Sequence, residues 1–552
     1  MLFNSCEVTD LDLLDNPNAV LPENADLESL YNSVQGEFEQ FVASTQFFTM
    51  QLSRQRAFTA GNVYDTAFSP INFDGIWNNA YADFLPDANA VIDLATPTGQ
   101  LQHVGTAKIM QSYVLTTLVD LFGDVPLSQA GQGIDVLSPS ADSGADVYAA
   151  ARQLLLDGIA DLEANTAAAP VIDVAYGGNT GNWIRAANSL LMRIAVTTND
   201  VGTFDALVAA DNFISGVTSD FQIEYGSTRA NPDSRHPLYV NHYEAADGAY
   251  LSNWFMWSMN DAKNVVDPRI RAYFYRQVAS IPLDDINLFD CINSVLPDPE
   301  STPQHYLACD PEMPYCVASI ADGYYGRDHA NGNGIPPDGP IRTRYGVYPA
   351  GGKFDNNSFI DTQNLGVDGA LGQGIHPLMP SFFVNFYRAE MAAKSGDDAT
   401  AREQLLIAVE ASIAKVLNFI QRDQGSLTEV VAEDLDGNQI LGNAFVPGED
   451  AVAAYLEEVG IIFDDSSDKL DVVTTEFLIA SWGNGIEAYN LVRRTARPLN
   501  LQPAILTSAG TFIRSALYPA THVNLNQTAS QKSVFDQVFW DTQPANLGPC
   551  FN

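Results

Sequence analysis

The sequence predicts a mainly α-helical protein in which helix pairs stack on one another and a loop-rich half carries the ligand site. Apolar residues recur at helical spacing up to about residue 215 and again from about 379 to 495. Between residues 216 and 378 this periodicity fails, and Gly, Pro, Asn, Asp and aromatic residues become frequent. With 552 residues, the chain is long enough to bury a large core.

The first helical region shows its periodicity in segments separated by turn residues. The segments 28–45 and 75–95 each carry an apolar stripe, and Pro86 is expected to kink or divide the second one. The segment 105–123 is apolar nearly all round, so we expect it to be buried on most sides. Further helices are expected at 146–163, 182–197 and 203–215.

The second helical region contains the clearest helix pair. A helix at 381–394 and another at 400–420 are separated by a short turn, in which Gly396 suits a left-handed cap and Asp398 can cap the second helix. Several such pairs in one chain favour a stack that resembles tetratricopeptide repeats, although no fixed period of about 34 residues is visible. One more helix is expected at 472–493.

The charge balance narrows the classes of partner. The chain has 27 Lys and Arg residues against 68 Asp and Glu, a net charge of −41. Such a surface repels phosphate backbones, so we expect no nucleic-acid partner. No stretch reaches the roughly 18 consecutive apolar residues that a membrane-spanning helix needs.

The cysteines allow three interpretations. Four of the five lie at Cys291, Cys309, Cys316 and Cys550, and an even number fits two disulfides, with free thiols or a metal site as alternatives. Cys309 and Cys316 bracket a short loop with two prolines, which one bridge could close. The sequence leaves the pairing open.

Enzyme signatures are missing from the sequence. HExxH, GxSxG and phosphate-loop patterns are all absent, so we expect neither an enzyme nor a cofactor or metal site. The stretch "EDLDGNQ" at 433–439 lacks the glutamate of a calcium loop and is interpreted as a turn. Trp482, Arg493 and Arg494 are interpreted as packing residues, with the arginines ion-paired to Glu487.

Binding is better supported by the composition of the loop-rich region. Aromatic rings can stack on the flat faces of sugars, while amide and charged side chains bind the hydroxyl groups. The stretches "NWFMW" and "DGYYGRDHANGNG" offer this mixture on expected loops, although the same rings could instead pack the loops onto the helices. The candidate ligand-binding residues are Trp254, Trp257, Tyr324, Tyr325, Arg327, Asp328, Asn331, Trp77 and Arg54.

Five segments, in order along nearly the whole chain, resemble the SusD/RagB family of Bacteroidetes outer-membrane lipoproteins. They include "SYVLTTLVDLFGDVPLSQA", with its Gly-Asp-Val-Pro turn, "NWIRAANSLLMRIA", and "WGNGIEAYNLVRRTARPLNL" near the C-terminus. Each motif is weak by itself, but the ordered set is specific. The segments are 107–130, 176–195, 265–274, 482–501 and 513–541.

The resemblance implies a function and a location. It implies a single SusD-like domain over 26–552, preceded by a tail at 1–25 whose Cys6 carries lipid and anchors the protein to the outer membrane. Within this domain, 26–215 and 379–495 would form the scaffold, 216–378 the loop-rich insert and 496–552 a closing segment.

The family's activity would be to capture oligosaccharides or polysaccharide at the cell surface. It would deliver them to a SusC-like TonB-dependent barrel transporter without breaking a bond. Three alternatives remain open from the sequence: a peptide-binding member of the same family, a glycan-degrading enzyme, and a scaffold that only seals the transporter.

Overall fold

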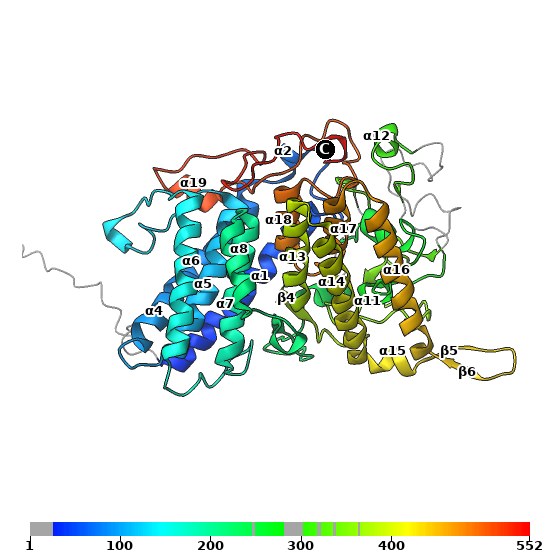
Figure 1. Cartoon of the computed structure of the whole chain (residues 1–552), viewed down its shortest axis with the longest axis horizontal. Coiled ribbons are helices and arrows are strands. Elements are labelled where there is room, and N and C mark those ends of the chain that lie inside the picture. The colour runs from blue at the N-terminus through cyan, green and yellow to red at the C-terminus, as the bar shows by residue number, and fades with distance from the viewer. Residues whose placement is uncertain are drawn as a thin grey trace, which may run out of the picture.

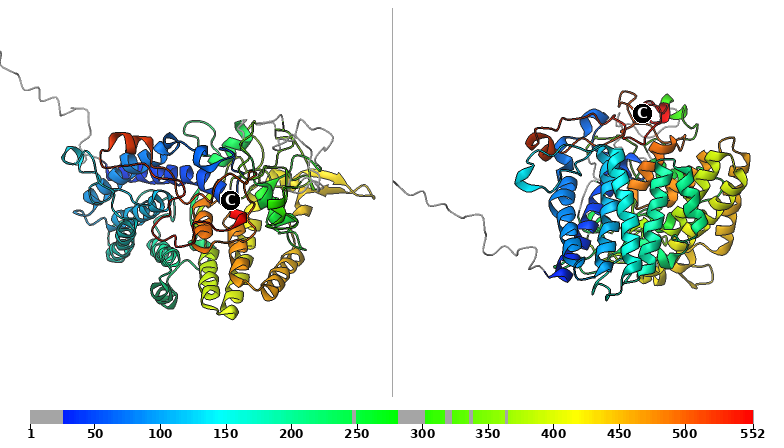
Figure 2. Two further views of the ribbon diagram at one scale, coloured as in Figure 1. Left: turned by 90° about the horizontal axis from the view of Figure 1, so that it is seen from above. Right: turned by 60° about the vertical axis from the view of Figure 1, so that its left-hand side comes forward.

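The protein is mainly α-helical, as the periodicity predicts, and its strands are short. In the computed structural model the long helices stand side by side across the molecule, and the C-terminal segment crosses their upper ends (Figure 1). Seen from above, the loop-rich region, drawn in green, gathers toward the side of α16 and the β5–β6 hairpin (Figure 2). The structure describes residues 26–245, 249–280, 302–316, 322–334, 338–362 and 365–551.

The first helix is longer than the periodicity predicts, and the second is divided. Helix α1 (Leu27–Leu52) continues past the expected end at residue 45, and the Asp26 side chain caps its start by accepting a hydrogen bond from the Ser29 N–H at 3.0 Å. The segment around Pro86 is divided, because that proline lies in the first turn of a new helix. This segment consists of α3 (Asp74–Asn78), the π-helix η3 (Asn79–Phe84) and α4 (Leu85–Ala95).

The scaffold consists of antiparallel helix pairs packed in sequence. Consecutive pairs contact one another, α6 against α7, α7 against α13 and α13 against α17. In the first pair the backbones approach closely, since a Cβ at Gly105 would lie 2.7 Å from the Gly158 carbonyl oxygen. The pairs are α5 (Leu101–Phe122) with α6 (Gly144–Ala164), α7 (Thr180–Thr197) with α8 (Val201–Ala210), α13 (Ser381–Ser395) with α14 (Asp398–Phe419), and α17 (Lys469–Ala480) with α16 (Glu449–Asp465).

Two helix-end details differ from the expectation. Gly396 does take the left-handed conformation, with φ of 77°, but the cap of α14 is Asp397 rather than Asp398, and it accepts a hydrogen bond from the Thr400 N–H at 3.1 Å. The helix expected at 472–493 is two helices, α17 and α18 (Gly485–Thr495), separated where Gly483 has a φ of 91°. The sequence analysis also missed helix α16.

Three short antiparallel strand pairs complete the regular structure. The pair β1 (Phe221–Glu224) and β4 (Ile375–Met379) joins the two ends of the loop-rich region. The pair β2 (Phe274–Tyr275) and β3 (Arg344–Tyr345) lies within it. The hairpin of β5 (Val430–Glu433) and β6 (Gln439–Leu441) projects from the body, and the predicted turn at 433–439 forms its tip (Figure 1).

The core extends from the helix pairs into the loop-rich region. The ring of Trp482, between α17 and α18, stacks on Phe255 and Tyr345 of the loop-rich region with centroid distances of 5.2 and 5.3 Å. The predicted ion pair is confirmed for Arg494, which contacts Glu487 at 2.8 Å. Both α18 residues are buried, so this pair belongs to the interior of the scaffold. It is not confirmed for Arg493, whose guanidinium donates to the Asp120 and Arg514 carbonyl oxygens at 2.7 Å.

The disulfide pairing differs from the short loop that the sequence suggested. Cys309 is bonded to Cys550, not to Cys316, and so ties the loop-rich region to the C-terminal turn. Cys316 is also disulfide-bonded. Cys6 and Cys291 lie outside the described residues.

A search of the described residues finds no helix that combines the length and the apolar character needed to cross a membrane.

Candidate functional site

The two tryptophans expected on an exposed loop lie instead on a buried helix. Trp254 and Trp257 belong to α10 (Asn253–Asn260) and are 1% and 4% exposed. They line a small cavity of about 160 Å³ between α10 and the α16–α17 pair, and the Trp254 Nε1 has no hydrogen-bond partner among the described residues. The expected loop position is therefore wrong, and a binding role for these rings stays a prediction.

The tyrosine pair is buried as well. Tyr324 and Tyr325 are each 2% exposed. The ring of Tyr324 lies between Phe274, at a centroid distance of 6.4 Å, and the Arg276 guanidinium, 5.0 Å from the ring centroid. The Tyr325 backbone N–H donates to the Thr343 hydroxyl at 2.9 Å. Neither ring presents a face on which a sugar could stack in this conformation.

The polar candidates beside the tyrosines have partners within the protein. The Asp328 carboxylate accepts hydrogen bonds from Asn253 Nδ2 at 2.9 Å, from the Cys316 N–H at 2.7 Å and from Gln502 Nε2 at 2.9 Å. The Arg54 Nε donates to the Gln502 carbonyl oxygen at 3.1 Å. These five residues, which we call the Asp328 cluster, bring two distant sequence candidates together.

The remaining candidates divide between this neighbourhood and a separate one. The Arg327 guanidinium lies over the Tyr250 ring at 4.3 Å, and the Asn331 Oδ1 accepts from the Asn333 N–H at 3.2 Å. Trp77 lies elsewhere, packed against the His522 ring at a centroid distance of 4.4 Å. All nine candidates are thus less than a tenth exposed, because long-range packing covers them.

A better-formed site lies between α1 and the segment that follows its connecting loop. This groove, which we call the aromatic groove, has a volume of about 480 Å³. On α1 its lining residues recur at helical spacing, so they share one face of the helix. The lining residues are Gln40, Ser44, Phe47, Phe48, Gln51, Phe68, Asn72, Phe73, Gly75, Ile76 and Asn79.

Four phenylalanine rings form the apolar part of the aromatic groove. The Phe48 ring meets the rings of Phe68 and Phe73 edge to face, each at a centroid distance of 5.1 Å. Phe47 and Phe68 are only partly buried, so parts of these rings remain accessible. The Arg56 guanidinium lies over the Phe47 ring at 4.9 Å, which fixes that ring from one side.

Two polar side chains of the aromatic groove, Asn79 and Gln51, have buried atoms without a hydrogen-bond partner among the described residues. Asn79 is only 3% exposed, yet neither its Oδ1 nor its Nδ2 has a hydrogen-bond partner among the described residues. The same is true of the Gln51 Oε1. Leaving such a buried group unpaired costs about 1–3 kcal/mol, so a ligand that offers hydroxyl groups gains by pairing with it. None of the described residues that line this groove is titratable.

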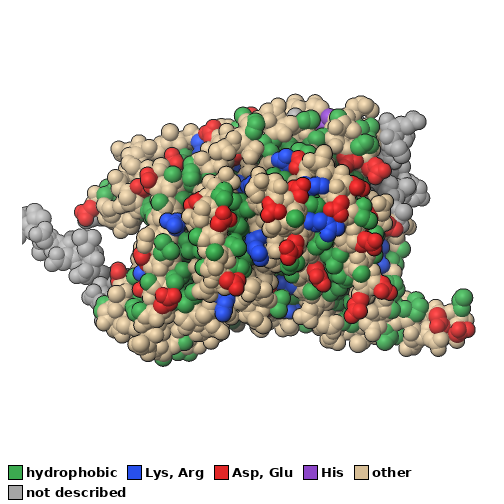
Figure 3. Space-filling view, in the orientation of Figure 1, with side chains coloured by type: hydrophobic (Ala, Val, Ile, Leu, Met, Phe, Trp, Pro, Cys, Tyr) green, Lys and Arg blue, Asp and Glu red, His purple; other side chains and the backbone are tan. Residues whose placement is uncertain are grey.

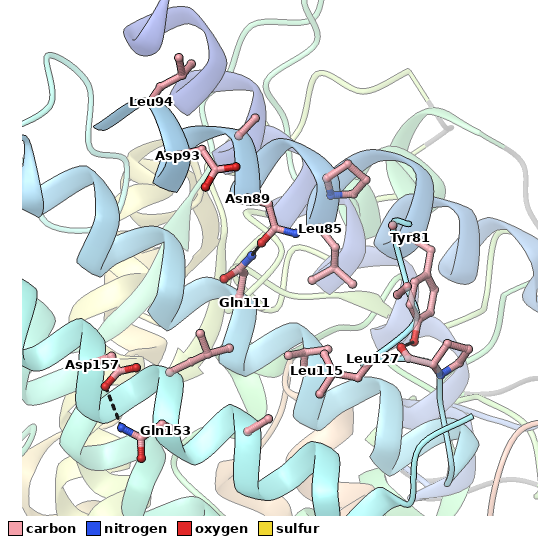
Figure 4. A pocket seen from close by; sticks show the side chains of 17 residues that line it. Tyr81, Leu85, Asn89, Asp93, Leu94, Gln111, Leu115, Leu127, Gln153 and Asp157 are labelled. Carbon is pink, nitrogen blue, oxygen red and sulfur yellow. Dashed lines mark hydrogen bonds between the residues drawn. The ribbon is translucent and has the colours of Figure 1, made fainter. Parts of the chain in front are cut away.

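A groove larger than the aromatic groove lies on the helix pairs, and its amide side chains are paired within the protein. It lies between α4, α5 and α6 and has a volume of about 870 Å³ (Figure 4). Its amides are already paired, since Gln111 donates to Asn89 at 2.7 Å and Gln153 donates to Asp157 at 2.7 Å. The Tyr81 hydroxyl likewise donates to the Pro126 carbonyl oxygen at 2.7 Å. Size alone therefore does not identify the better site.

The sequence analysis missed the aromatic groove. The expected first helix ended at residue 45, which removed Phe47, Phe48 and Gln51 from the pattern. A continued search for the helical period through "TQFFTMQL" would have placed these three on the same face as Gln40. Phe68, in the irregular stretch that follows, gave no comparable signal.

The architecture defines a class of protein, a stack of helix pairs with an irregular half that closes one side. Residues 15–287 match the family model SusD-like_2, described as "Starch-binding associating with outer membrane". This match bears out, over residues 15–287, the resemblance to the SusD/RagB family that the sequence motifs indicate.

Solved structures of the family share the fold. A SusD/RagB family protein from Bacteroides thetaiotaomicron is 17% identical with a TM-score of 0.64, and a SusD homolog from Bacteroides fragilis is 15% identical with a TM-score of 0.62. A chitin-binding SusD homolog from Flavobacterium johnsoniae is 18% identical with a TM-score of 0.60. Each alignment covers 94% of this chain and 100% of the other. No curated protein matches the chain.

Proposed function

We propose that this protein is a surface glycan-binding protein that captures oligosaccharides in the aromatic groove. The observation that carries this proposal is the unpartnered amide of Asn79 beside a set of phenylalanine rings. A sugar offers both kinds of contact, since its C–H face can cover Phe47 or Phe68 while its hydroxyls pair with Asn79 and Gln51.

The neutral lining supports binding over hydrolysis. Glycoside hydrolysis normally needs two carboxyl groups that flank the bond, and the described lining residues of the aromatic groove include no carboxyl group. We therefore assign capture and release to this groove. The family model is described as starch-binding and one relative as chitin-binding, which makes neutral glucan and chitin oligosaccharides the first ligands to test.

Delivery to a transporter completes the proposed role. We infer that the protein hands its ligand to a SusC-like TonB-dependent barrel, and that lipid on Cys6 holds it at the outer-membrane surface. Stable anchoring by lipid alone requires more than one acyl chain, which a multiply acylated cysteine supplies. Mass spectrometry of the native protein should detect acyl chains on Cys6, and a Cys6→Ser variant should leave the membrane fraction.

The test is calorimetric titration of the purified protein with maltooligosaccharides and chitin oligosaccharides. Asn79→Ala should weaken binding by about tenfold, because a hydrogen-bonded pair is worth on the order of 1–2 kcal/mol. Phe68→Ala should weaken it by a similar factor through lost ring contact. Asn78→Ala is the matched control, since Asn78 is the exposed neighbour of Asn79.

Three outcomes would contradict the proposal. Equal affinity in Asn79→Ala and Asn78→Ala would place the ligand elsewhere. New reducing ends after incubation with the oligosaccharides would indicate an enzyme. Binding of peptides but of no oligosaccharide would favour a peptide-binding member of the family.

A further inference from the structure

A second groove lies between two neighbouring helix pairs of the scaffold. It separates the α7–α8 pair from the α13–α14 pair, and the C-terminal segment closes it with Trp540, Thr542 and Gln543. Helix α8 has only 10 residues against 22 in α14, so the outer row of helices leaves a space between them. We call this space, of about 820 Å³, the inter-pair groove.

The inter-pair groove contains a cation that the protein does not neutralise. Arg388 on α13 lines the groove and is partly buried, and among the described residues it has no ion pair, hydrogen bond or ring contact. An arginine without an ion pair is unusual in a chain that has 68 acidic residues and only 27 Lys and Arg residues. On the face shown in Figure 3, acidic side chains are scattered over the surface and outnumber the basic ones, several of which lie over the region of α8, α13 and α14.

The other charged residues of the inter-pair groove form an ion pair or a hydrogen bond within the protein, or are exposed to solvent. Lys394 contacts Glu390 at 2.8 Å, and Arg494 contacts the same carboxylate at 2.8 Å. Of the two acids in the lining, Asp397 caps α14 through the Thr400 N–H, and Asp205 is exposed. Arg388 is therefore the cation in this groove that can still take an anionic partner.

The uncharged part of the lining fits a small polyhydroxylated ligand. Hydroxyl and amide side chains line the same groove as Arg388, and Phe204 and Trp540 add an apolar surface. A volume of about 820 Å³ lies in the range of small-molecule sites. The hydroxyl and amide residues are Thr197, Thr198, Asn199, Ser395, Thr400, Thr542 and Gln543.

We propose that the inter-pair groove binds a carboxylate-bearing sugar, with the carboxylate paired to Arg388 and the hydroxyls to the surrounding threonine, asparagine and glutamine side chains. A planar guanidinium can hold a carboxylate through two parallel hydrogen bonds. The negative net charge of the protein opposes anion binding in general, so a carboxylate would bind here only through its local pairing with Arg388. It is separate from the aromatic groove, whose described lining carries no charge.

The test compares D-glucuronate with D-glucose by calorimetry or ligand-detected NMR. Wild type should bind glucuronate and not glucose at this groove, and added NaCl should weaken the binding. Arg388→Gln should weaken glucuronate binding by about tenfold or more. Arg152→Gln is the matched control, because Arg152 is an exposed arginine on α6 and its loss changes the net charge equally.

Further measurements keep the proposal falsifiable. Oligosaccharide binding in the aromatic groove should be unchanged in Arg388→Gln, which shows that the variant is folded, and Arg388→Lys should retain part of the glucuronate affinity. Equal weakening in Arg388→Gln and Arg152→Gln would show a diffuse charge effect and overturn the site. Binding of sulfate without glucuronate would overturn the sugar class, and the absence of any anion binding to wild type would overturn both.

Discussion

The Asp328 cluster and the aromatic groove both contain buried amide side chains, but the polar groups are paired in the cluster and unpaired in the groove. In the cluster, three donors converge on the Asp328 carboxylate, and burial raises the pKa of that group. In the groove, the equally buried Asn79 amide is left without a partner. Composition alone therefore cannot separate a structural cluster from a binding site, whereas the pairing of polar groups can.

The difference also predicts what each region contributes. A fully paired buried group stabilises the fold, and its removal leaves its partners unpaired. An unpaired buried group costs stability in the free protein and gains a partner only when a ligand binds. Substitutions in the first class should lower stability, and substitutions in the second should lower affinity.

The largest effect is expected at Glu390, a buried acid of the scaffold with two cationic partners. It is fully buried and contacts both Arg494 and Lys394 at 2.8 Å. Glu390→Gln should lower the free energy of unfolding by about 3–5 kcal/mol, because it removes the charge that Arg494 and Lys394 share and leaves Arg494 to Glu487, a carboxylate that Arg193 also contacts. Urea denaturation measures this value, and Glu410→Gln, at an exposed position of the neighbouring α14, should change it by less than about 0.5 kcal/mol.

The same carboxylate should make the fold sensitive to acid. Burial by itself would raise the pKa of Glu390, but the Arg494 and Lys394 charges outweigh it and lower the pKa from 4.5 to about 2. Because the folded pKa is the lower one, this contribution is present above about pH 4.5 and is lost as the pH falls toward 2. The loss amounts to about 3 kcal/mol, and it should be absent from the acid denaturation curve of Glu390→Gln.

A smaller loss is expected in the Asp328 cluster. Asp328→Asn keeps the shape but points an amide donor at groups that themselves donate, so stability should fall by about 1–3 kcal/mol. Asp93→Asn, on the exposed face of α4, is the control and should have little effect. The oligosaccharide affinity of folded Asp328→Asn should match that of wild type. A loss of affinity would instead show that Asp328 belongs to the ligand site.

The sequence predicts the scaffold better than the site, and the reason is physical. Helical periodicity is a local signal, so three of the four helix pairs and the division at Pro86 could be predicted, whereas α16 of the fourth pair was missed. The exposure of a ring is decided by distant segments, and the sequence around Trp254 does not show that α16 and α17 cover it. The aromatic groove depends on Phe68, which comes from a stretch without periodicity, so no local pattern joins it to α1.

The smallest effect on stability is expected at Asn79, and it gives the sharpest test of the comparison. Asn79→Ala relieves the cost of a buried amide without a partner among the described residues but also loses the packing of that side chain, so the two effects offset and the free energy of unfolding should stay within about 0.5 kcal/mol of wild type. Thermal denaturation with and without a saturating oligosaccharide then separates the two regions, because a ligand that binds only the folded state raises its melting temperature. Asp328→Asn should start from a lower melting temperature and keep the full ligand-induced rise, whereas Asn79→Ala should start near wild type and lose most of it. The opposite pattern would mean that the paired cluster is the site and the unpaired groove is structural.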